Sequence, residues 1–288
     1  MDALSFLHML NGLLMLVLPL GLAIFLTRQW RIGWRLWLIG AAIFLLSQVF
    51  HYPFISYMGD LLNRTPLATL SQEARLLITA AFLGLSAGLF EELFRYGMFR
   101  WWAKDARSWR SAILTGAGHG GAEAILLGMI VMFVYFQFLA IRNLDLSTVF
   151  SGDQLPLARE QVAAYWSMNW YDSVLGALER LFTIPTQIAL AVLVVQAFIR
   201  KQAVWVWLAV LYHALLDATA IITASLLGIY WTEAVSGIFA TLSIIIIFRL
   251  RRPEPEPAPD RKSAIPPPVF TSKPVEETAE NLDSSRYS

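Results

Sequence analysis

Apolar stretches of about 20 residues recur along this 288-residue chain, and they constrain its fold more than any other feature. A helix of about that length crosses the roughly 30 Å hydrocarbon core of a bilayer. Of all residues, 57% are hydrophobic and 15% are charged, whereas soluble domains are roughly 45–50% apolar and about 25% charged. The sequence therefore predicts a polytopic membrane protein with an all-α fold.

The apolar stretches predict about seven membrane-spanning helices. They cover residues 4–26, 34–57, 76–101, 112–139, 171–199, 204–227 and 231–248. From about residue 253 the chain is rich in proline and acidic residues and poor in large apolar ones. Such a segment cannot bury enough surface to fold alone. We expect a membrane domain at 1–252 and a disordered cytoplasmic tail at 253–288.

Lys and Arg near the helix ends predict the orientation, because short cytoplasmic loops are enriched in them. They cluster after every second span: Arg28, Arg31 and Arg35, then Arg100, Lys104, Arg107 and Arg110, then Arg200 and Lys201, then Arg249, Arg251 and Arg252. The alternate loops are poorer in basic residues or carry mixed charge. This pattern predicts an N-terminus outside the cell and a C-terminus in the cytoplasm.

Three charged residues, Glu91, Glu92 and Arg95, interrupt the third predicted span. A charged side chain at the centre of a bilayer costs about 2.5–3.5 kcal/mol on insertion scales, so such residues usually have a function. Arg95 follows Glu92 by three residues and Glu91 by four, and side chains at both spacings are neighbours on a helix. Arg95 can therefore neutralise either carboxylate and leave the other free, and the sequence does not decide which.

Two further spans each carry a histidine followed by an acid four residues later. His119 and Glu123 lie in the glycine-rich fourth span, and His213 and Asp217 lie in the sixth. Counted from the predicted cytoplasmic ends, these histidines and the glutamate pair of the third span lie roughly 12–15 Å deep at 1.5 Å per residue. The glycines predict close contacts between helices. We therefore expect the polar residues of the three helices to meet.

A single buried acid or histidine is often no more than an interhelical hydrogen bond. Four acids and an arginine at one level would cost roughly 15 kcal/mol before pairing, about as much as a whole folding free energy. This cost favours a chemical or transport site. Glu179 and Arg180 lie in the opposite half of the fifth span, where Glu179 either reaches the site or takes part in an interhelical salt bridge. The other two histidines, His8 and His51, are expected near the outer ends of their spans.

The order of these motifs resembles the CPBP superfamily, which includes CAAX prenyl endopeptidases and bacteriocin-processing enzymes. The matching residues are Glu91-Glu92-x-x-Arg95, His119 and His213-x-x-x-Asp217. The Gly-His-Gly-Gly-x-Glu segment around His119 is most similar to the YhfC-like branch of bacterial intramembrane metalloproteases. The resemblance covers about residues 76–220.

The resemblance implies a helical endopeptidase that cuts a membrane-associated protein or peptide in a bacterial plasma membrane. It implies Glu91 or Glu92 as the base that activates water, with His119 assisting. His213 with Asp217 would stabilise the oxyanion or hold a metal. The chain departs from the family pattern at Arg95, which comes one residue early and so has the first glutamate as its four-residue partner. It also has Thr115 in place of a phenylalanine, and Glu123 is added.

Two chemical routes stay open. In the first, a glutamate takes a proton from water and passes it to the leaving amine, while imidazoles stabilise the oxyanion. In the second, His119, His213 and an acid, Glu123 or Asp217, bind Zn²⁺ and leave one coordination position open. Neither histidine–acid pair has the His-Glu-x-x-His spacing of a zinc signature. The first route needs no cofactor, and the second needs zinc.

An ion or proton transporter is the main alternative, since buried acids and histidines also line transport pathways. The sequence shows no internal repeat of the kind found in transporters, and its acids gather in one half of the membrane. A catalytically inactive scaffold is a third hypothesis.

A net charge of +1 disfavours nucleic-acid binding, and the lack of cysteine excludes thiolate ligands. The expected partners are the lipid bilayer and an unidentified membrane-associated substrate.

Overall fold

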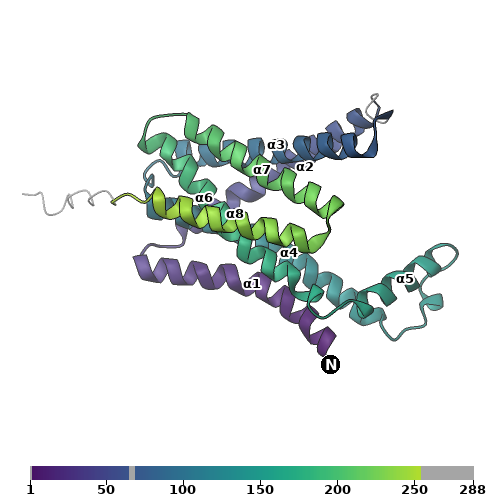
Figure 1. The fold of residues 1–288 in the computed structure, drawn as a ribbon. Coiled ribbons are helices and arrows are strands. Elements are labelled where there is room, and N and C mark those ends of the chain that lie inside the picture. Colours follow the sequence, from purple (N-terminus) through teal and green to yellow (C-terminus); the bar gives the residue numbers. More distant parts are fainter. Residues whose placement is uncertain (1, 65–68, 254–288) are drawn as a thin grey trace, which may run out of the picture. The chain divides into compact units, whose positions relative to one another are not determined.

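The computed structural model describes residues 2–64 and 69–253, and every regular element in those ranges is helical. Seven helices are long and apolar enough to cross a membrane, which confirms the predicted all-α membrane bundle (Figure 1). They are α1 (Ala3–Trp30), α2 (Arg35–Asn63), α3 (Gln72–Gly97), α4 (Trp109–Ile141), α6 (Leu175–Ile199), α7 (Val204–Leu226) and α8 (Ile229–Arg249). Except for Pro253, the predicted tail at 253–288 lies outside the described residues.

The remaining elements are short. A π-helical turn, η2 (Met98–Trp102), continues α3, and the 3₁₀ turns η3 (Leu146–Thr148) and η4 (Asp172–Val174) flank α5 (Gln154–Ser167). Helix α5 was not predicted, because its 14 residues alternate between polar and apolar side chains and are too few to span a bilayer. It lies beside the end of α4 (Figure 1), and its Tyr165 stacks on His8 near the start of α1. Helix α2 also runs six residues past its predicted end at residue 57.

Helix α6 is the central helix of the bundle. It packs against α1, α3, α4, α7 and α8. In its most apolar stretch of 18 residues, 72% is buried inside the protein. Its buried side chains are mostly Ala, Val, Leu and Ile, as in Ile188 to Val195. Because α6 is surrounded by protein rather than lipid, it can supply polar groups to the interior at little cost.

Glycines set the spacing between the helices that carry the charged residues, as the sequence predicted. An added Cβ at Gly84 would lie 2.5 Å from the carbonyl oxygen of Ala214, and one at Gly88 would lie 2.6 Å from that of Val210. Both of these oxygens belong to α7, so α3 and α7 touch backbone to backbone. Close approach through small residues is the usual way in which membrane helices gain contact.

One end of the bundle carries a cross-link between two of the basic connections. Arg35, at the start of α2, donates a 2.7 Å hydrogen bond to Asp105, which follows η2. The Arg35 guanidinium holds the pKa of Asp105 below its usual range. The contact shows that the basic connections after the first and third spans lie at the same end, as the charge pattern requires.

We predict that Gly88→Ala destabilises the protein. The new methyl group would meet a backbone carbonyl, which cannot rotate away, so α3 and α7 must separate. Overpacking of this kind costs about 1–3 kcal/mol. Thermal unfolding in detergent should show a lower midpoint. Gly21→Ala is the matched control, because nothing lies within 4 Å of its added Cβ; an equal loss in both variants would contradict the interpretation.

Candidate functional site

The two adjacent glutamates of α3 have different partners, which the sequence alone did not decide. The guanidinium of Arg95 donates from Nη1 to both carboxylate oxygens of Glu92, and both side chains are buried. Its Nη2 donates a 2.6 Å hydrogen bond to Oε1 of Gln187 on α6. Arg95 therefore pairs with its three-residue neighbour, and its charge is used by Glu92 rather than by Glu91.

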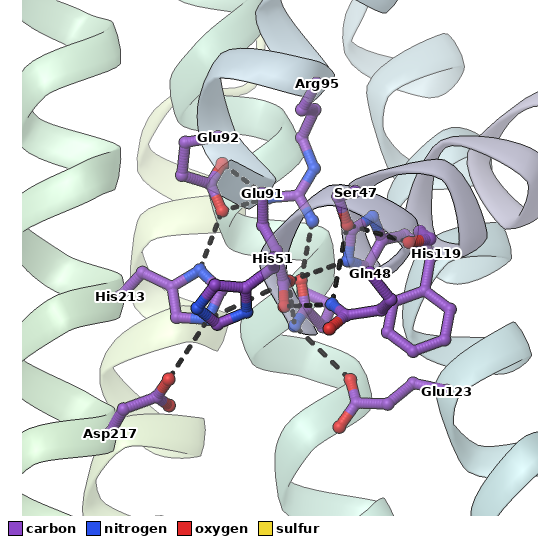
Figure 2. A network of polar contacts seen from close by, with 12 residues as sticks. Ser47, Gln48, His51, Glu91, Glu92, Arg95, His119, Glu123, His213 and Asp217 are labelled. Atoms are coloured by element: carbon purple, nitrogen blue, oxygen red, sulfur yellow. Dashed lines mark hydrogen bonds and ion pairs between the residues drawn. The ribbon is translucent and has the colours of Figure 1, made fainter. Parts of the chain in front are cut away.

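Glu92 also orients His213 of α7. Nδ1 of His213 lies 2.9 Å from Oε1 of Glu92. A carboxylate paired with arginine accepts hydrogen bonds, so Nδ1 of His213 carries the hydrogen. The other ring nitrogen, Nε2, then points away from Glu92, 3.6 Å from Asp217 and 3.9 Å from Glu91 (Figure 2).

Glu91 is held by amide and imidazole groups from three other helices. Nε2 of Gln48, on α2, donates to its Oε1 at 2.9 Å. Nε2 of His119, on α4, lies 2.9 Å from its Oε2, and the fully buried ring packs edge-on against Phe44. Nε2 of Gln187 lies at the edge of hydrogen-bond range, 3.5 Å from the same oxygen. These contacts fix the carboxylate without neutralising it by an arginine or lysine.

A cavity of about 390 Å³ opens in front of Glu91. Its walls come from α2, α3, α4 and α7 and are mostly apolar, and the polar side chains that line it are Gln48, His51, Tyr52, Glu91, Glu123 and Asp217. Neither His119 nor His213 is among the described residues that line it. A cavity of this volume can hold water and part of a peptide chain.

Glu123 lines the cavity with Glu91 and Asp217, but it is paired with an arginine from another helix. Its carboxylate accepts a 2.7 Å hydrogen bond from Nη1 of Arg180 on α6, and Nε2 of Gln187 lies 3.4 Å from its other oxygen. Nη2 of Arg180 also bonds Glu179. Glu179 therefore forms neither of the contacts expected for it, since its partner is Arg180 of the same helix, and the interhelical salt bridge is the one by which Arg180 links α6 to α4.

The proposed zinc ligands are not assembled in the described part of the chain. There, no three His, Asp or Glu side chains are placed to share one metal ion. Their donor types suit zinc, but Glu123 is held by Arg180, and Nε2 of His119 is directed at Glu91. The set His119, His213, Glu123 and Asp217 therefore does not fit a metal in this arrangement.

Three residues of the site were not identified from the sequence. Gln48 and Gln187 carry no charge, although an amide inside an apolar span is a signal that a search for charged residues passes over. His51 was expected near the outer end of its span, but it lines the same cavity as Glu91. Its Nε2 lies 3.0 Å from Oγ of Ser86, and its ring packs against Phe90.

We predict that Glu92→Gln destabilises the protein far more than Glu91→Gln. The first change leaves Arg95 buried without its counter-charge, and breaking a buried ion pair from one side costs about 3–5 kcal/mol. The second removes a carboxylate whose hydrogen-bond partners are amides and an imidazole. Thermal unfolding of the two variants in detergent measures the difference.

The double variant Glu92→Gln/Arg95→Met is the control for this interpretation. Removing both charges of a buried pair is often nearly neutral, so we expect it to recover part of the stability lost in Glu92→Gln. Equal unfolding midpoints for the two single variants would show that Arg95 does not depend on Glu92.

Comparisons with known proteins agree with the motifs. The model of a family described as YhfC intramembrane metalloprotease matches residues 14–240. The uncharacterized membrane protein YhfC of Bacillus subtilis (strain 168) is 28% identical over 254 residues, which cover 84% of this chain and 95% of that protein. No solved structure matches the chain. The resemblance is thereby supported at the level of the YhfC branch, and the wider CPBP superfamily stays a prediction. This multi-pass membrane protein belongs to the YhfC intramembrane metalloprotease family.

Proposed function

We propose that the protein is an intramembrane endopeptidase and that Glu91 is the base that activates water. One observation carries the proposal. Arg95 neutralises Glu92, so Glu91 keeps a carboxylate that faces the cavity and is fixed by hydrogen bonds. A positioned carboxylate in a water-accessible cavity is what general-base hydrolysis requires. The substrate is a membrane-associated protein or peptide, since the cavity is apolar and opens within the helical bundle.

The other polar residues have supporting roles in this mechanism. Gln48 and His119 hold the two oxygens of Glu91, so that a free lone pair of the carboxylate points toward water in the cavity. As water loses its proton to Glu91, its oxygen adds to the carbonyl carbon of the substrate. Glu92 keeps His213 in place through Nδ1. Glu92 is thus a positioning residue rather than a second base.

A metal is named in the family description, and zinc bound by histidines and an acid is the metal route considered from the sequence. Imidazole nitrogens and carboxylate oxygens are the ligands that catalytic zinc uses, and zinc would lower the pKa of a bound water. The described histidine and carboxylate side chains do not converge on one point. The proposed steps therefore involve only the side chains of the protein.

We propose that the site lies in the cytoplasmic half of the membrane. The positive-inside rule supports this orientation, and the Arg35–Asp105 contact joins two of the basic connections at one end of the bundle. The cavity residues Ile55, Leu127 and Ile221 lie farther than Glu91 from that end, so a substrate would reach Glu91 through the outer half of the bundle.

One observation favours the transporter as a second candidate. Polar contacts run from Glu91 through Gln187 to Glu123, and from there through Arg180 to Glu179. Such a chain crosses the interior of the bundle, as proton pathways do. Proton and cation flux into vesicles containing the purified protein distinguishes this candidate from a peptidase.

We predict that Glu91→Gln abolishes peptide cleavage by the purified protein in lipid vesicles. Loss of a general base lowers the rate about 10²–10⁴-fold, and the variant should stay folded for the reasons given above. A quenched fluorescent peptide with an apolar core reports cleavage. Glu73→Gln, on an exposed turn of the same helix, is the matched control and should retain full activity. Cleavage by the Glu91→Gln variant at the wild-type rate would disprove the assignment.

We predict that chelators leave this cleavage unchanged, because the side chains of the site do not converge on a common point. Elemental analysis of wild type, His119→Ala and His213→Ala, purified without chelator, checks the same prediction. About one zinc per chain in wild type, lost in both variants, would contradict it. That result would mean that the histidines turn from Glu91 toward a metal in the working enzyme.

A further inference from the structure

Cleavage of a peptide bond needs a proton on the leaving nitrogen, and Glu91 is poorly placed to carry it there. Both of its oxygens are held, one by Gln48 from α2 and the other by His119 from α4. A carboxylate fixed at both ends can accept a proton from water, but it cannot swing across the tetrahedral carbon to the nitrogen. A second group in the cavity wall must deliver the proton.

We propose that this group is His51 of α2, so that His51 is a further catalytic residue of the reaction. The inference rests on the proposed function. His51 lines the cavity together with Glu91 and Asp217, whereas His119 and His213 are absent from its described lining. It is therefore the histidine, among the described residues, that a substrate in this cavity would touch.

The contact with Ser86 determines which nitrogen of His51 is free. The hydroxyl of Ser86 donates its single hydrogen to the carbonyl oxygen of Leu83 at 3.0 Å. Its oxygen must then accept from the ring, so Nε2 of His51 carries a hydrogen. The lone pair is on Nδ1, for which the described residues supply no hydrogen-bond partner. A ring anchored at Nε2 with Nδ1 open is the arrangement that proton transfer requires.

Apart from Tyr52, which is 62% exposed, the other polar groups of the cavity wall have partners that remove them from this role. Nε2 of Gln48 donates to Glu91, and Glu123 is paired with Arg180. Asp217 lies beside Nε2 of His213. A purely structural role for His51 explains its contacts with Ser86 and Phe90, but it does not explain an imidazole with an unused nitrogen in an apolar cavity.

The proton balance closes without any further reactant. Glu91 takes one proton from water, and the remaining hydroxide forms the new C–O bond. His51 receives that proton from Glu91 at Nδ1 and gives it to the amide nitrogen as the C–N bond breaks. The products are a carboxylic acid and an amine, and both side chains return to their starting states. The proton taken from water thus ends on the leaving amine.

The test uses the full-length protein in lipid vesicles and two substrates that differ only in their leaving group. One is an apolar peptide anilide, whose leaving nitrogen must be protonated. The other is the matching nitrophenyl ester, whose leaving oxygen departs as a stable anion. For His51→Gln we expect kcat to fall about 100-fold on the anilide and to change less than about 3-fold on the ester. Glu91→Gln should lose both reactions.

Two further variants keep the result interpretable. Ser86→Ala frees the ring from its anchor and should weaken anilide cleavage while sparing the ester. His8→Gln, which removes a histidine stacked on Tyr165 and absent from the cavity lining, should change neither. Thermal unfolding confirms that each variant is folded.

Equal losses of His51→Gln on both substrates, or no loss on either, would overturn the role of His51 while leaving the proposed function intact. A wild-type protein that cleaves neither substrate would overturn the proposed function and the inference with it.

Discussion

The buried ion pair between Arg95 and Glu92 is the interaction on which the rest of the site depends. It satisfies two charges that a bilayer-spanning helix cannot leave unpaired. It also divides the tasks of two neighbouring glutamates. Glu92 forms an ion pair with Arg95, and one of its oxygens also bonds His213. The second terminal nitrogen of the guanidinium donates to Gln187. Glu91 is left with hydrogen bonds from amides and an imidazole, which is why the base of the proposed reaction is assigned to it.

The packing of the bundle explains how such a group is supported. Uncharged amides from α2 and α6 surround the charged residues of α3, so that most of the polar atoms in the interior have partners without adding further charge. Buried polar groups are tolerated when they are hydrogen-bonded in this way. The second pairing, of Arg180 with Glu123, removes one acid from the site. The polar residues thus form two linked groups, which Gln187 joins.

Most of the fold could be predicted from the sequence, because seven apolar stretches of about 20 residues each form a helix that spans the membrane. The meeting of Glu91, Glu92, His119 and His213 was also predicted, since depth along a helix follows from residue counting. The pairing of Arg95 was not, because three- and four-residue spacings are equally allowed. The part of His51 in the cavity wall was not predicted, because lateral packing decides which face of a helix meets the cavity. Glu123 failed as a ligand because its partner, Arg180, comes from a helix outside the motif.

The glycine contacts between α3 and α7 have a mechanical consequence. Two helices that touch backbone to backbone at Gly84 and Gly88 move as one body. Glu91 on one and His213 on the other therefore keep their separation while the protein fluctuates. Helix α2 is held against α4 near Trp37 and Gly40, whereas its stretch around His51 meets the rest of the site through side chains. That stretch of α2 has no such backbone contact to hold it, so its displacement would widen the cavity for a peptide at the lowest packing cost.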